Sequence, residues 1–68
     1  MNTANDDGLL NTAQAAELLN VSPSTIYAWT MRRTIPHFKL GHLVRFRRSD
    51  LIEFAEQNRV EPIRTSMN

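Results

Sequence analysis

The chain has 68 residues, no cysteine and a formal net charge of +1 at pH 7. This length is enough for one small domain but too short to enclose a deep substrate cavity, and without cysteine there are no disulfides or thiolate zinc sites. No segment resembles a signal peptide or a membrane span, so we expect a soluble protein of the cytoplasm that carries no cofactor.

The basic residues are segregated from the acidic residues along the chain. No acidic residue occurs between Glu17 and Asp50, and this stretch holds both histidines and six of the eight basic residues: Arg32, Arg33, Lys39, Arg45, Arg47 and Arg48. Such segregation predicts a surface with one positive face, which suits a polyanion such as nucleic acid. The alternative is a chance cluster of solvated side chains.

Capping signals predict two short helices after a disordered leader of residues 1–8. Asn11 and Gln14 fit a capping box for a helix that continues through Leu19, and Asn20 suits a left-handed helix end. Ser22 is a suitable N-cap and Pro23 a suitable first residue for a second helix, from about Pro23 to Arg32.

The spacing between these helices is typical of a helix-turn-helix. The three-residue link 20–22 is too short for antiparallel packing, so the helices must cross steeply. Ala16 supplies a small residue at the crossing. The expected buried set is Ala15, Leu19, Val21, Ile26 and Trp29. A generic helical hairpin is the alternative, but it does not explain the absence of acids from the outward face of the second helix.

A β-hairpin is predicted over residues 38–46, after the helix-breaking Ile35-Pro36. A three-residue loop, Gly41 to Leu43, would pair Leu40 with Val44 and Phe38 with Phe46. We favour this register over a two-residue Gly41-His42 loop, because it places the four apolar side chains on one face and Lys39 and Arg45 on the other.

A third helix is predicted to start near Ser49, with Asp50 and Glu53 at the positive end of its dipole. Leu51, Phe54 and Ala55 form the stripe expected to pack inward. The predicted fold is therefore mainly α with a small β-hairpin: a winged helix-turn-helix of three helices and a two-stranded wing over residues 9–58. Residues 59–68 form a flexible tail.

The outward face of the second helix and the hairpin form the candidate DNA-binding surface. Short polar side chains at the start of the helix allow close approach to a groove, and a hairpin arginine fits a neighbouring minor groove. The alternative at each of these positions is an ordinary exposed residue, and at Arg45 it is an ion pair with Glu53 or Glu56. The candidates are Ser22, Ser24, Thr25, Tyr27, Ala28, Met31, Arg32, Lys39, His42, Arg45 and Arg47.

Taken together, these motifs resemble the excisionase-type, MerR-like winged-helix domains over roughly Leu9 to Asn58. The resemblance rests on Leu9-Leu10-Asn11, Ala15-Ala16-Glu17-Leu18-Leu19-Asn20-Val21-Ser22, Ser24-Thr25-Ile26-Tyr27, Ile35-Pro36, Leu40-Gly41, Val44-Arg45-Phe46 and Ser49-Asp50-Leu51. It implies that the second helix enters the major groove and the hairpin the minor groove. It also implies DNA contacts from Tyr27, Arg32, Arg45 and Arg47. Arg33 and Thr34 depart from the family, which commonly has a glycine and an acid there.

Family members include phage and transposon excisionases, which direct an integrase towards excision, and small transcriptional regulators. The small size favours an excisionase, with a regulator as the alternative and a protein-docking module as a second. Double-stranded DNA is the expected partner, and the 59–68 tail is expected to contact an integrase or a neighbouring copy. No enzymatic motif is present, because His37 and His42 lack cysteines or nearby acids and no Gly-x-Ser-x-Gly occurs.

Overall fold

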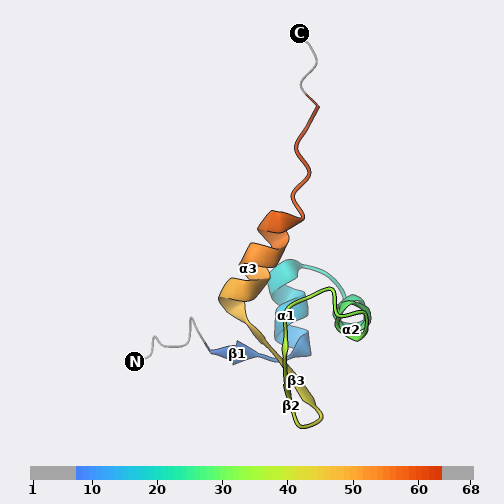
Figure 1. The fold of residues 1–68 in the computed structure, drawn as a ribbon, viewed down its shortest axis with the longest axis vertical. Helices are drawn as coiled ribbons and strands as arrows, with labels where there is room; N and C mark the ends of the chain where they lie inside the picture. Colours follow the sequence, from blue (N-terminus) through green and yellow to red (C-terminus); the bar gives the residue numbers. More distant parts are fainter. Residues whose placement is uncertain (1–7, 64–68) are drawn as a thin grey trace.

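The computed structural model describes residues 8–63 and has three helices and three short strands. In chain order these are β1 (Leu9–Leu10), α1 (Thr12–Leu19), α2 (Pro23–Met31), β2 (Phe38–Leu40), β3 (Leu43–Arg47) and α3 (Arg48–Gln57). In Figure 1, α1 lies between α2 and α3, and the β2–β3 hairpin projects beyond the helices. The winged helix-turn-helix prediction is confirmed.

The caps predicted for the first two helices are present. The Asn11 Oδ1 accepts from the Gln14 amide at 2.8 Å, and the Gln14 Oε1 accepts from the Asn11 amide at 2.9 Å. Asn20 has φ 58° and ψ 46°, the left-handed conformation expected at the end of α1. Ser22 caps α2, and Pro23 is its first residue. These local signals fix where α1 ends and α2 begins.

The core lies where α1, α2, β3 and α3 meet. Its buried side chains are Ala15, Ala16, Ile26, Ile35, Phe46 and Leu51. Leu19, Val21 and Trp29 were expected to be buried as well, but they are only partly buried against this core. The ring centroids of Trp29 and Phe54 lie 5.5 Å apart at a tilt of 58°, which joins α2 to α3.

The predicted register of the hairpin is wrong. The structure pairs Phe38 with Arg45, Lys39 with Val44 and Leu40 with Leu43, which leaves the two-residue loop Gly41-His42. Gly41 has φ 66° and is the first loop residue, the glycine position of a type II′ turn. The twist of such a turn matches that of the flanking strands, so turn geometry prevailed over apolar alternation.

Two further details differ from the sequence-based expectations. Leu9–Leu10 forms an edge strand, because Leu9 pairs with Arg47 and Leu10 with Phe46, and the sheet therefore has the order β1-β3-β2. Ala55 is exposed, whereas Leu51 is buried and Phe54 half-buried, because α3 packs on α1 and β3 along its Leu51–Phe54 side. The predicted leader lies outside the described residues except for Gly8, and so do residues 64–68 of the predicted tail.

Candidate nucleic-acid interface

The start of α2 presents a cluster of three hydroxyl groups. The Ser22 Oγ lies 3.0 Å from the Ser24 Oγ and 2.9 Å from the Thr25 Oγ1, and it accepts from the Thr25 amide at 3.3 Å. Ser22 and Ser24 are exposed and Thr25 is half-buried. The cluster is therefore open to solvent at the positive end of the helix dipole, where an anion is favoured.

The middle and end of α2 expose larger side chains. Tyr27 is 63% exposed and Met31 65% exposed, one helical turn apart, and Ala28 beside them is half-buried. Arg32 caps the C-terminus of the helix and is exposed. The outward face of α2 thus combines apolar surface with one cation and has no acidic residue.

The corrected register changes which hairpin side chains share a face. Cross-strand partners point to the same side, so Lys39 lies on the face of Val44 and Phe46, towards the helices. The expectation that Lys39 accompanies Arg45 on the outer face is therefore wrong. Arg45 shares the opposite face with Phe38, and its Nη1 donates to the carbonyl oxygen of Val44 at 2.8 Å.

Arg47 lies on the same outer face as Arg45. Its guanidinium carbon is 5.0 Å from the ring centroid of Phe38, which is within the range of a cation–π contact. Arg45 has no ion pair with Glu53 or Glu56, because the one ion pair within residues 8–63 joins Arg59 to Glu61 at 3.5 Å. The hairpin arginines therefore keep their charge available to a ligand.

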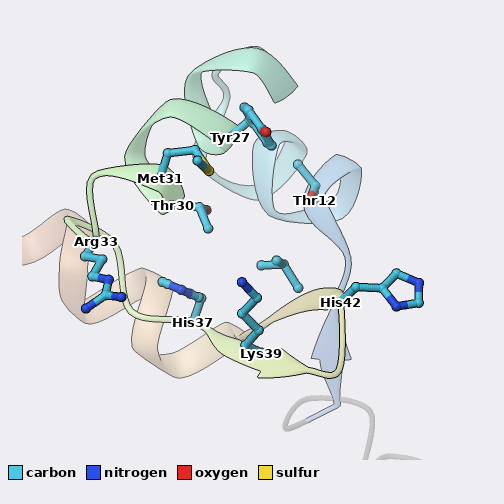
Figure 2. Close-up of a pocket in the computed structure, with 9 residues that line it drawn as sticks. Thr12, Tyr27, Thr30, Met31, Arg33, His37, Lys39 and His42 are labelled. Carbon is cyan, nitrogen blue, oxygen red and sulfur yellow. The ribbon is translucent and has the colours of Figure 1, made fainter.

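A cleft of about 540 Å³ separates α2 from the hairpin, and we call it the helix–wing cleft. None of the residues that line it is acidic; they are Thr12, Tyr27, Thr30, Met31, Arg33, His37, Lys39, His42 and Val44. Figure 2 shows Lys39 rising from β2 into the cleft, whereas the His42 side chain points away from it. The cleft thus brings the exposed face of α2 and the inner face of the hairpin together around positive charge.

Five residues of the cleft were missed from the sequence as candidates: Thr12, Thr30, Arg33, His37 and Val44. Arg33 and His37 belong to the acid-free window, which was the signal that could have found them. The His37 Nδ1 lies 2.8 Å from the carbonyl oxygen of Ile35, so this nitrogen carries the hydrogen and the Nε2 is left for a ligand. No sequence feature pointed to Thr12 and Thr30, because their position in the cleft depends on how α1 and α2 cross.

Comparison with known proteins agrees with this geometry. The model of a helix-turn-helix domain family matches residues 9–59. The chain belongs to this helix-turn-helix family. No solved structure matches the chain significantly.

A curated relative of this helix-turn-helix protein is the transcriptional repressor DcmR of Methylorubrum extorquens. The two are 41% identical over 51 residues, which cover 72% of this chain and 19% of the repressor. The chain therefore spans about a fifth of the length of the curated relative that it matches. Within residues 8–63, no helix is long and apolar enough to cross a membrane, and no group of three or more His, Asp or Glu side chains could hold a metal ion.

Proposed function

We propose that this helix-turn-helix protein binds double-stranded DNA sequence-specifically, with α2 in the major groove and the β2–β3 hairpin in the minor groove. One observation carries the proposal: the exposed face of α2 and the inner face of the hairpin line a single cleft that has no acidic residue. Phosphates provide most of the affinity of proteins for DNA, and an acid-free positive surface is what they require.

On this proposal, α2 supplies both phosphate contacts and base contacts. The hydroxyls of Ser22, Ser24 and Thr25 donate to phosphate oxygens at the start of the helix. Ala28 and Met31 offer apolar contacts to thymine methyl groups, and Tyr27 donates its hydroxyl to a base edge or a phosphate. Arg32, at the helix end, binds the backbone.

The hairpin supplies cations to both walls of the minor groove. Lys39 lies on its inner face, Arg45 and Arg47 lie on its outer face, and His42 is at its tip. A narrow minor groove has an enhanced negative potential that attracts such side chains. The two faces of the hairpin then meet the two strands that border the groove.

The family and the relative favour a non-enzymatic regulator, and two biological roles have support. Likeness to a transcriptional repressor favours control of transcription. Resemblance to excisionases favours a role in recombination, with an integrase or a neighbouring copy bound through the 59–68 tail. Footprinting on promoters and on recombination sites, followed by an excision reaction with and without the tail, separates the two roles.

The test of DNA binding is a fluorescence-anisotropy titration of a labelled mixed-sequence duplex at several salt concentrations. We expect affinity to fall steeply with salt, and the slope of log K against log salt to decrease by about one in Arg45→Ala. Arg59→Ala is the matched control, because it removes the same charge from a residue that is already paired with Glu61. Selection from a random duplex pool then measures specificity.

Two results would contradict the proposal. If Arg59→Ala and Arg45→Ala lower the slope equally, the hairpin is not a binding element and only net charge matters. If the wild type does not bind a duplex even at low salt, the domain is a protein-docking module, a use to which this fold also lends itself.

A further inference from the structure

The first two helices end with the same pair of backbone hydrogen bonds. After α1, the amides of Asn20 and Val21 donate to Glu17 at 3.2 Å and to Ala16 at 2.9 Å. After α2, the amides of Arg33 and Thr34 donate to Thr30 at 3.0 Å and to Trp29 at 2.9 Å. This is the Schellman arrangement, which requires one residue in the left-handed conformation.

The two left-handed residues differ in how well they suit that conformation. Asn20 has φ 58° and Arg33 has φ 59°, and they are the two non-glycine residues with positive φ within residues 8–63. Asparagine adopts this conformation readily because its short side chain bonds locally, whereas arginine is strained there. Such strain is retained chiefly where the side chain has a function.

The Arg33 side chain lines the helix–wing cleft together with Lys39 and His37. Figure 2 shows Arg33 and His37 at the end of the cleft where α2 gives way to the loop. Arg33 is exposed and makes no ion pair within the described part of the chain. Its guanidinium is therefore free to bind an anion that enters the cleft.

The geometry of DNA indicates which anion this is. In B-form DNA, a sugar–phosphate strand separates the major groove from the minor groove. A protein that places a helix in one groove and a hairpin in the other must straddle that strand, and the space between the two elements receives it. A guanidinium is well matched to a phosphate, because its fork of N–H donors binds two oxygens at once.

We propose that Arg33 and Lys39 bind phosphates of the DNA strand that lies in the helix–wing cleft, and that the chain retains an arginine at a strained position for this contact. The inference rests on the proposed DNA binding and extends it, because it makes the end of α2 a second site of phosphate contact in addition to the hairpin. Arg33 thus adds a phosphate contact beside the one proposed for Arg32 at the end of α2.

The experiment compares Arg33→Asn and Arg33→Gly with the wild type, because both replacements suit the left-handed backbone. Thermal unfolding and the salt-dependent anisotropy titration with the mixed-sequence duplex are measured on the same samples. We expect both variants to unfold at or above the wild-type temperature. We also expect them to bind the duplex about tenfold more weakly, with a salt slope lower by about one. Arg59→Ala, which removes an equal charge, is expected to bind much more like the wild type.

Three results would overturn the inference. If Arg33→Asn binds like Arg59→Ala while Arg45→Ala is weakened, Arg33 makes no DNA contact, although the proposed function stands. If both Arg33 variants unfold well below the wild type, the arginine stabilises the fold itself. If the wild type binds no duplex at low salt, the proposed function fails and the inference with it.

Discussion

Replacing Gly41 tests the turn on which the hairpin register depends. Gly41 has φ 66°, and a Cβ built on it meets no atom within 4 Å. A substitution to alanine therefore adds no steric clash, and its cost comes from the backbone conformation alone. In the three-residue loop expected from apolar alternation, the left-handed residue would be the last one, Leu43, and Gly41 would have a negative φ.

The size of the effect follows from two opposing contributions. An L-residue in the left-handed region costs about 1–2 kcal/mol. Replacing glycine by alanine restricts the unfolded chain and returns about 0.4–1 kcal/mol. The expected net loss for Gly41→Ala is thus about 1 kcal/mol, or a fall of about 4–8 °C in Tm for a domain of this size.

The assay is thermal unfolding of synthetic chains that carry L-alanine or D-alanine at position 41. D-alanine restricts the unfolded chain equally but prefers positive φ, so we expect Gly41→D-Ala to be more stable than the wild type by about 0.4–1 kcal/mol. If the L-variant equals or exceeds the D-variant in Tm, Gly41 does not have a positive φ. The register described for β2 and β3 would then be wrong.

Three further changes test the caps, the core and the cleft. Ser22→Ala is expected to lower the unfolding free energy by about 1 kcal/mol, measured by thermal unfolding, because the α2 cap is lost. If Ser24→Ala lowers it equally, capping is not the cause. Ile26→Ala is expected to cost about 2–5 kcal/mol in a urea titration, because Ile26 is fully buried; a loss below about 1 kcal/mol would contradict that burial. Lys39→Ala is expected to lower the salt slope of duplex binding by about one, and a slope equal to that of Arg59→Ala would remove Lys39 from the interface.

Much of the fold could be predicted because the signals that start and end its helices are local. The capping box of Asn11 and Gln14, the left-handed Asn20 and the pair Ser22-Pro23 each act within a few residues. Short-range hydrogen bonds of this kind depend little on the rest of the molecule. The helix-turn-helix followed from them, since a link of three residues leaves the two helices few ways to pack.

The candidate site could be predicted in part, because composition shows which residues are cationic but not what they face. The acid-free window contained every basic residue of the helix–wing cleft. The presence of Thr12 in the cleft depends on tertiary packing between α1, α2 and the hairpin, and no local pattern encodes it. The pairing of β1 with β3 was missed for the same reason, because a strand of two residues has no periodicity to detect.

The register prediction failed at the proposed interface, where a lysine and not an apolar side chain lies on the inner face of the hairpin. Alternation favours apolar residues along the inner face of a hairpin, yet Lys39 occupies that face beside Val44. Local rules that fail in natural proteins tend to fail at functional positions, where a side chain is selected for a ligand and not for packing. Lys39 is exposed on this face, so its charge stays in solvent and can reach a phosphate that lies in the cleft. Arg33, in its left-handed conformation at the other end of the cleft, departs from local preference in the same way. Lys39 and Arg33 both line the helix–wing cleft, and a DNA strand bound in this cleft would account for both exceptions.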